Sequence, residues 1–104
     1  MSTSVPSIDG VRNVLTRPEQ LAGLAEEATE LAHAALKLRR AIDQSNPTPV
    51  TVEDATANLL EEIGDVLLCL EVLQFSTCAS AYIEDMQAKL TRWVDRLHKE
   101  GADV

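Results

Sequence analysis

Residues 59–73, LLEEIGDVLLCLEVL, decide the fold class, because their apolar residues recur at the three- and four-residue spacing of one helix face. Residues 24–38, LAEEATELAHAALKL, repeat this pattern earlier in the chain. Both stretches are rich in Leu, Ala and Glu, which are strong helix formers. They therefore predict two long amphipathic helices.

Start and stop signals set the limits of the predicted helices. Thr16, followed by Pro18 and Glu19, has the pattern of a capping box, so the first main helix is predicted over about residues 18–42. A Pro-containing loop at 43–51 separates it from a second helix over about 52–75. A turn at 76–80 precedes a third helix over about 81–99. The chain is predicted to be all-α.

Each predicted helix has an apolar stripe that we expect to face the core. The stripes consist of Leu21, Leu24, Ala28, Leu31, Ala35, Leu38 and Ile42 in the first helix, Leu59, Ile63, Val66, Leu67, Leu70 and Leu73 in the second, and Ile83, Met86, Leu90, Trp93, Val94 and Leu97 in the third. Three helices leave an apolar face uncovered. We therefore expect a four-helix-type bundle, completed by a short N-terminal helix or by oligomerisation into a homodimer or homotetramer.

Composition limits the class of protein. A chain of 104 residues with 45% hydrophobic residues is expected to be one folded domain over 1–104, with residues 1–15 as a loose N-terminal arm that includes a short turn of helix at 10–15. The net charge of −8 disfavours nucleic acid as a partner. Cys69 and Cys78 do not have zinc-site spacing. No stretch has the pattern of a signal peptide or membrane span, so we expect no membrane partner and a cytoplasmic location.

Paired carboxylates occur at the margin of two apolar stripes. Glu27 and Glu30 are three residues apart and so lie on one side of the first helix, as Glu62 and Asp65 do on the second. Packing the helices together would gather four carboxylates, which a hard divalent cation stabilises. Oxygen ligands favour Mg²⁺ or Mn²⁺ over zinc. The alternative is a solvated helix face, since 17 of the residues are acidic.

These two acidic stretches resemble the signature helices of the MazG-like all-α nucleoside triphosphate pyrophosphohydrolases, whose pattern is Glu-Glu-x-x-Glu, a spacer, then Glu-x-x-Asp. Residues 89–97, KLTRWVDRL, are similar to a basic third-helix segment of that family. The resemblance covers about residues 18–97. It implies magnesium-dependent cleavage of a (deoxy)nucleoside triphosphate to a monophosphate and pyrophosphate, in nucleotide-pool house-cleaning.

The resemblance also implies roles for individual residues. The implied metal ligands are Glu27, Glu30, Glu62 and Asp65, and the residues that would orient or activate water are Glu26, Glu27 and Glu61. Candidate phosphate contacts are Lys37, Lys89, Arg92 and Arg96, and candidate base-pocket residues are Cys69, Trp93 and His33. Each of these has a structural alternative: an ion pair or surface face for the basic residues, core or interface packing for Trp93, an exposed His33 and a buried, unreactive Cys69.

Two other functions compete with this one. A phosphoribosyl-ATP pyrophosphohydrolase shares the EEATE string at 26–30, but this sequence lacks that family's preceding Ser-Tyr-Thr segment and the Tyr-His after the second acidic motif. A non-catalytic helical oligomerisation or regulatory module needs the same core but no metal. Titration with magnesium and a non-hydrolysable triphosphate separates that module from an enzyme.

Overall fold

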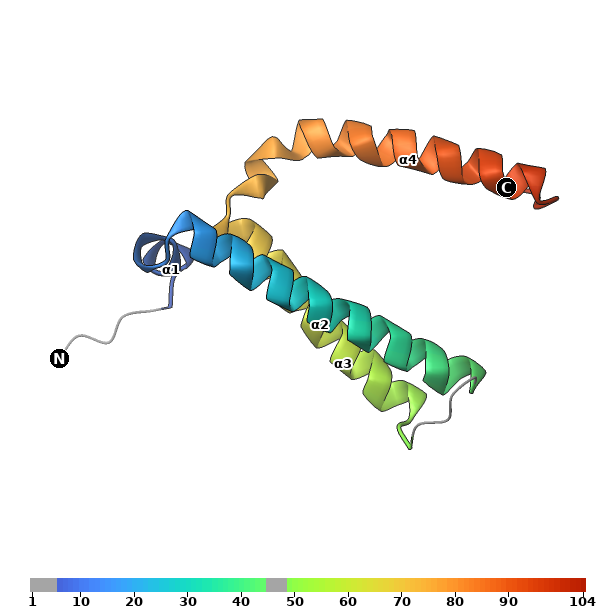
Figure 1. The fold of residues 1–104 in the computed structure, drawn as a ribbon, viewed down its shortest axis with the longest axis horizontal. Coiled ribbons are helices and arrows are strands. Elements are labelled where there is room, and N and C mark those ends of the chain that lie inside the picture. Colours follow the sequence, from blue (N-terminus) through green and yellow to red (C-terminus); the bar gives the residue numbers. More distant parts are fainter. Residues whose placement is uncertain (1–5, 45–48) are drawn as a thin grey trace. The chain divides into compact units, whose positions relative to one another are not determined.

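The structure, a computed structural model, describes residues 6–44 and 49–104. In these residues the regular elements are α1 (Ile8–Val14), α2 (Arg17–Asp43), α3 (Val52–Val72), the short 3-10 helix η1 (Phe75–Cys78) and α4 (Ala79–Lys99) (Figure 1). Every regular element among the described residues is a helix, which confirms the all-α prediction. The start of the predicted N-terminal arm, residues 1–5, and the middle of the predicted loop, residues 45–48, lie outside the described residues. The chain divides into two compact units, residues 1–74 and 75–104, and the single domain over 1–104 stays a prediction.

The two long helices of the first unit begin at the caps that the sequence predicts. The Thr16 hydroxyl accepts a hydrogen bond from the Glu19 amide at 3.2 Å, and the Thr16 amide donates to the Glu19 carboxylate at 2.9 Å. This is the predicted capping box. Thr51 caps α3 in the same way, accepting from the Asp54 amide at 3.0 Å. Both helices therefore start within one residue of the expected position.

Three predicted boundaries are wrong. The short turn of helix predicted at 10–15 within the N-terminal arm is α1, which begins earlier, at Ile8, because the Ser7 hydroxyl caps it by accepting from the Gly10 amide at 3.0 Å. Helix α3 ends at Val72 and not at 75, because Gln74 has a φ of 64°, in the left-handed region that interrupts a helix. The predicted turn at 76–80 is instead η1, and α4 begins at Ala79.

The first unit is built around the packing of α2 against α3, with α1 packed against α3 (Figure 1). The buried hydrophobic side chains among the described residues are Ala34, Ala55, Val72 and Leu73. Alanines at this contact allow the two helices to approach closely. Several residues of the expected α2 stripe, including Leu21 and Ile42, are exposed instead, because α3 covers only part of it.

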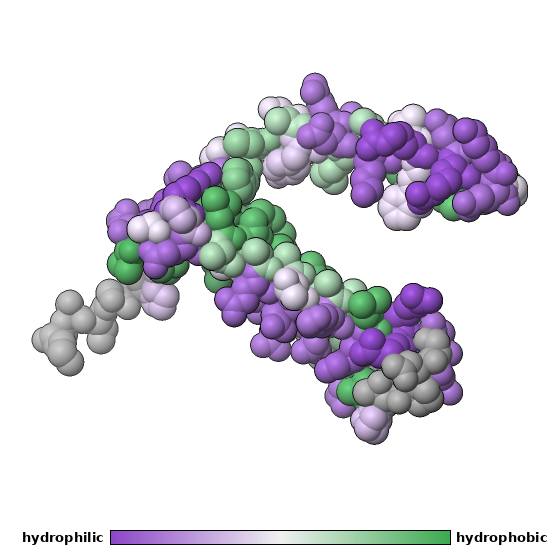
Figure 2. All heavy atoms as spheres, in the orientation of Figure 1, coloured by the Kyte–Doolittle hydropathy of each residue, from purple (hydrophilic) through white to green (hydrophobic). Residues whose placement is uncertain are grey.

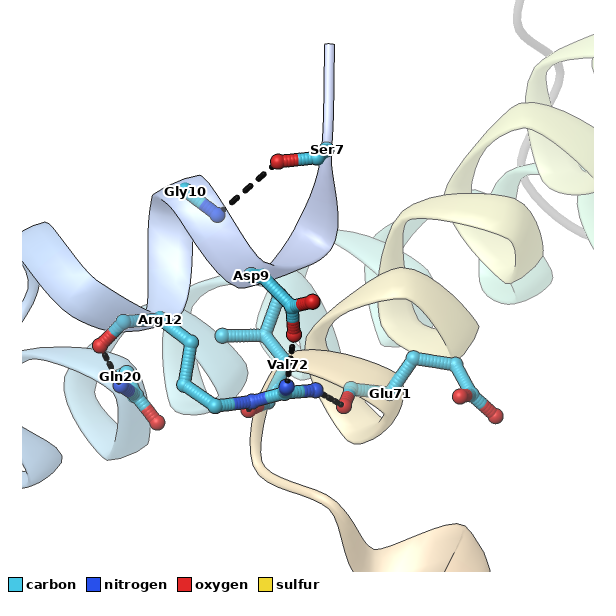
Figure 3. Close-up of polar contacts among 7 residues, drawn as sticks. All are labelled: Ser7, Asp9, Gly10, Arg12, Gln20, Glu71 and Val72. Atoms are coloured by element: carbon cyan, nitrogen blue, oxygen red, sulfur yellow. Dashed lines mark hydrogen bonds and ion pairs between the residues drawn. The ribbon is translucent and has the colours of Figure 1, made fainter.

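Arg12 of α1 binds the C-terminal end of α3 (Figure 3). Its Nε–H donates to the Val72 carbonyl at 2.8 Å and Nη2 donates to the Glu71 carbonyl at 2.9 Å. Nη1 pairs with Asp9 at 2.6 Å, which holds the guanidinium in place. The last carbonyls of a helix have no partner within the helix, so Arg12 satisfies two of them and fixes α1 to α3.

Two further side chains strengthen this junction. Arg17 Nη1 donates to the Leu73 carbonyl at 2.8 Å. Gln20, which is buried, donates from Nε2 to the Leu15 carbonyl at 3.0 Å and the Arg12 carbonyl at 3.3 Å. Gln20 Oε1 is buried without a hydrogen-bond partner. The ends of α1, α2 and α3 are thus joined by side-chain to backbone hydrogen bonds.

The second unit consists of η1 and α4. No residue of α4 is buried, and the predicted inward stripe of Ile83, Met86, Leu90 and Trp93 is 45–60% exposed. Of the predicted stripe, only Val94 and Leu97 are half-buried. The stripe is exposed because η1 is the only other element of the unit and is too short to cover it. Among the described helices, none is both long enough and apolar enough to cross a bilayer.

Candidate metal centre

Carboxylates from α2 and α3 meet on one side of the helix pair. One oxygen each of Glu27, Glu62 and Asp65 can be chosen so that all three lie within 4.8 Å of one another, and the three residues are half-buried. We call these residues the carboxylate triad. The triad contains three of the four predicted metal ligands. Glu30, the fourth, is exposed and lies outside this group.

The three negative charges of the triad repel one another. Burial raises the pKa of Glu62, and the negative charges of Asp65 and Glu27 raise it further. Burial likewise raises the pKa of Glu27, followed by repulsion from Asp65. Glu30 contributes to both shifts, so it lies close to the triad although it is exposed. A cation at this point would relieve both the repulsion and the lost hydration.

Two arginines of α1 and α2 have carboxylate partners outside the triad. Arg12 pairs with Asp9, and Arg39 pairs with Asp43 at 3.4 Å. The triad presents oxygen donors only, which Mg²⁺ and Mn²⁺ prefer, and Mg²⁺ typically combines a few carboxylates with waters and substrate phosphates. The residues present therefore fit a magnesium ion.

The remaining predicted residues of α2 and α3 lie outside the triad. Glu26 and Glu61 are exposed, and their charges add to the raised pKa values of Glu27 and Glu62 respectively. His33 is exposed and Lys37 is half-buried. The position of Lys37 on the acidic side of α2 suits either a phosphate or a carboxylate as its partner, as the sequence indicated.

The basic residues of α4 share one side of that helix. Lys89, Arg92 and Arg96 line a common surface hollow with Trp93. The shared helix side is the one that the sequence spacing predicts. These residues belong to the second unit, so their assignment to phosphate and base stays a prediction.

An apolar hollow lies beside the triad and was not predicted from the sequence. It measures about 390 Å³ and is lined by Pro6, Ser7, Ile8, Val11, Leu15, Glu19, Gln20, Gly23, Leu68, Cys69 and Val72. Gly23 precedes Glu27 by one turn, and Cys69 follows Asp65 by one turn, so the hollow adjoins the triad along both helices. The sequence did not reveal it because one wall is α1, and no local pattern shows where that short helix packs. The one local sequence signal of the hollow is Gly23, because the absence of a side chain there leaves open space in its wall.

Cys69 is the residue that links the hollow to the triad. Burial raises the pKa of its thiol, and the charges of Glu27 and Asp65 raise it further. A thiol with a raised pKa is a weak nucleophile at neutral pH. Cys69 therefore acts as a small, neutral part of the wall, which agrees with the unreactive alternative given above.

The triad predicts an unusual response of stability to pH. The folded-state pKa values of Glu27 and Glu62 are raised above their usual 4.5. Their favourable contribution to the free energy of unfolding is therefore complete below pH 4.5, and it is lost as the pH rises through the raised values. At pH 7, saturating Mg²⁺ should restore this loss and raise the melting temperature by about 10 °C. Near pH 4.5 protons compete with the ion, so the increase should be much smaller.

Thermal unfolding with and without MgCl₂ from pH 4.5 to 7.5 measures this response. Sodium chloride at matched ionic strength is the control, since salt alone screens the repulsion. Glu19 acts in the opposite sense, because hydrogen bonds from Thr16 lower its pKa and its contribution is lost only at lower pH. Equal melting temperatures in the two salts at pH 7 would contradict a magnesium site at the triad.

Comparison of the chain with family models, curated proteins and solved structures gives no match.

Proposed function

We propose that this protein is a magnesium-dependent nucleoside triphosphate pyrophosphohydrolase, with Mn²⁺ as a possible replacement for Mg²⁺. It would cleave a (deoxy)nucleoside triphosphate to a monophosphate and pyrophosphate, in nucleotide-pool house-cleaning in the cytoplasm. The observation that supports this proposal is the triad, in which three carboxylates from two helices lie within 4.8 Å of one another. The resemblance of residues 18–97 to MazG-like enzymes supplies the reaction.

In this proposal Glu27, Glu62 and Asp65 hold the metal, and Glu30 is the fourth ligand. A metal held there would offset the negative charge of the triphosphate and of its phosphoryl oxygens in the transition state. One of the carboxylates Glu26, Glu27 and Glu61 orients or deprotonates the attacking water. Glu26 and Glu61 suit this role because both are exposed to water and adjoin the triad.

In this proposal the apolar hollow binds the base or the sugar of the nucleotide. Its lining is mostly hydrophobic, as binding sites for flat organic groups usually are, and it adjoins the triad at Gly23 and Cys69. A small thiol at Cys69 leaves room that a large side chain would fill. The resemblance assigns phosphate contacts to Lys37, Lys89, Arg92 and Arg96, and adds Trp93 and His33 to the base pocket.

The proposal includes a homo-oligomer, either a homodimer or a homotetramer. The exposed stripes on α2, α3 and α4 support it, because many large apolar side chains lack cover within the described residues. Pairing of two copies would complete a four-helix-type bundle from α2 and α3.

Incubation with a panel of triphosphates tests the activity. The panel contains the canonical ribo- and deoxynucleoside triphosphates, several base-damaged ones and phosphoribosyl-ATP, each with MgCl₂ or with EDTA. We expect pyrophosphate and a monophosphate from at least one of the nucleoside triphosphates, and no turnover with EDTA. Release of inorganic phosphate, or cleavage of phosphoribosyl-ATP alone, would contradict the proposed reaction.

Exposure of the stripe on α4 also suits a non-catalytic oligomerisation module. Calorimetric titration with Mg²⁺ and a non-hydrolysable triphosphate separates the two functions. Such a module would show no heat of binding, whereas the enzyme binds the triphosphate only when the metal is present.

A further inference from the structure

Gln20 lines the apolar hollow and is the buried polar side chain among the described residues, at 7% exposed. Its Nε2 donates to the Leu15 carbonyl at 3.0 Å and to the Arg12 carbonyl at 3.3 Å, which uses both hydrogens of the amide. The Oε1 atom of the same amide is buried and accepts no hydrogen bond from the described part of the chain. The junction of α1 with α2 therefore uses only the donor half of this side chain.

The two carbonyls fix the orientation of the Gln20 amide. Turning the amide by half a rotation would place Oε1 against the carbonyl oxygens of Leu15 and Arg12, and none of these oxygens can donate. Figure 3 shows Nε2 directed at the Arg12 carbonyl and Oε1 turned away from it. Buried acceptors without a donor are rare in folded proteins, because they lose their bonds to water without a replacement. The packing of the first unit makes no use of this acceptor.

The rest of the wall favours a flat apolar ligand that can donate a hydrogen bond. Figure 2 shows hydrophobic residues at the end of the first unit where α1 meets α2 and α3. Apart from Ser7 and Cys69, the polar side chains that line the hollow are the acceptors Glu19 and Gln20. The hydrogen bonds from Thr16 lower the pKa of Glu19, so this carboxylate is charged at neutral pH and adds a second acceptor to the wall.

We propose that the hollow selects a nucleotide whose base carries an exocyclic amino group, and that Gln20 is the residue that makes this selection. The base lies in the hollow, and its amino N–H donates to Gln20 Oε1. This inference rests on the proposed function, because it concerns the base of the same substrate. Oε1 is shielded from bulk water, so the donor is a group that enters the hollow and displaces side chains of its wall, as is common on binding. Sites that hydrogen-bond a substrate strongly reject analogues that lack the bonding group.

Two matched pairs of α,β-imido deoxynucleoside triphosphates test the selection by calorimetric titration with MgCl₂. One pair carries adenine or unsubstituted purine, and the other carries cytosine or 2-pyrimidinone, so hydrogen replaces only the amino group within each pair. We expect the amino-bearing member of at least one pair to bind about tenfold more tightly or better, because its counterpart leaves Oε1 unpaired in a filled hollow. Equal affinities within both pairs would overturn the proposal, whatever the behaviour of any variant.

Gln20→Met removes the acceptor and nearly keeps the length of the side chain. The ratio of affinities within the preferred pair should fall to about one. The melting temperature should also fall, because the Leu15 and Arg12 carbonyls lose their donor. Arg17→Met is the matched control, since it removes a hydrogen bond to the Leu73 carbonyl from the same junction, at a residue outside the described lining of the hollow. It should keep the wild-type ratio, and a wild-type ratio in Gln20→Met would overturn the role of Gln20.

Gly23→Leu tests whether the selection takes place in the hollow, and it does not depend on the folding of Gln20→Met. A Cβ at Gly23 would meet no atom within 4 Å, and leucine favours a helix more than glycine does, so the variant should fold at least as stably as the wild type. Because Gly23 lines the hollow, the added side chain should weaken binding of the amino-bearing triphosphate about tenfold or more. Wild-type affinity in this variant would overturn the placement of the base in the hollow.

The inference and the proposed activity can fail separately, because binding of the imido probes needs no turnover. A preference within one pair that Gln20→Met abolishes, without pyrophosphate release from any hydrolysable triphosphate, would overturn the activity alone. Pyrophosphate release with equal kcat/KM for amino-bearing triphosphates and their amino-free counterparts would overturn the inference alone.

Discussion

Replacing Glu62 by Gln should lower kcat/KM for triphosphate hydrolysis by about a thousandfold. The substitution preserves the shape of the side chain but removes the charge of one proposed metal ligand, whose oxygen lies within 4.8 Å of oxygens of Glu27 and Asp65. A bound metal contributes several kcal/mol of transition-state stabilisation, and each 1.36 kcal/mol corresponds to a factor of ten in rate. The variant should also lose the increase in melting temperature that Mg²⁺ gives at pH 7.

Glu71→Gln is the matched control for this experiment. It makes the same chemical change on the same helix, at an exposed residue outside the triad, and should retain nearly full activity. Because Glu62→Gln also removes repulsion within the triad, the metal-free variant should be at least as stable as the wild type. Equal kcat/KM for Glu62→Gln and wild type would remove the metal site from the proposal.

Replacing Leu73 by Ala should destabilise the protein by about 2–5 kcal/mol, the usual range for a buried leucine. Leu73 is 1% exposed and is the largest fully buried side chain among the described residues. Total stabilities of small proteins are about 5–15 kcal/mol, so this loss should leave a measurable unfolded fraction at 37 °C. Urea denaturation followed by circular dichroism measures it.

Leu73→Met separates the loss of volume from other effects at this position. Methionine nearly conserves the buried volume, so the cost should be under about 1.5 kcal/mol. If Leu73→Ala and Leu73→Met cost the same, the packing of this side chain would not be what stabilises the end of α3.

Local sequence signals predicted the long helices well, because those signals are local in physical origin. The hydrogen bonds between Thr16 and Glu19, and from the Asp54 amide to Thr51, form within three residues. The boundaries differ from the prediction where a single residue determines the start or the end of a helix. Ser7 caps a helix in a polar segment. Gln74 adopts a left-handed φ of 64°, a conformation that the sequence would normally signal with a glycine.

The candidate site was predictable in the part that depends on helix periodicity. Spacing of three residues placed Glu62 beside Asp65 on α3, and the packing of α2 brought Glu27 to them. Glu30 lies further out, because its side chain points more toward solvent than that of Glu27. The hollow required knowledge of how α1 packs, which no local pattern contains. The α4 stripe is exposed in the single chain, since periodicity identifies an apolar face but not what covers it.

The hydrogen bonds of Arg12 to the Glu71 and Val72 carbonyls have a consequence for the order in which the chain opens. They join residues 59 and 60 positions apart in sequence, so they form only after the intervening chain has closed into a loop. Helix α1, with seven residues, is too short to persist once they break. In native-state hydrogen exchange, the amides of α1 and of the last turn of α3 should therefore exchange together as one opening unit, at lower free energy than the middle of α2. The hollow would lose its α1 wall in that opening, while Glu27, Glu62 and Asp65, further along α2 and α3, would stay together.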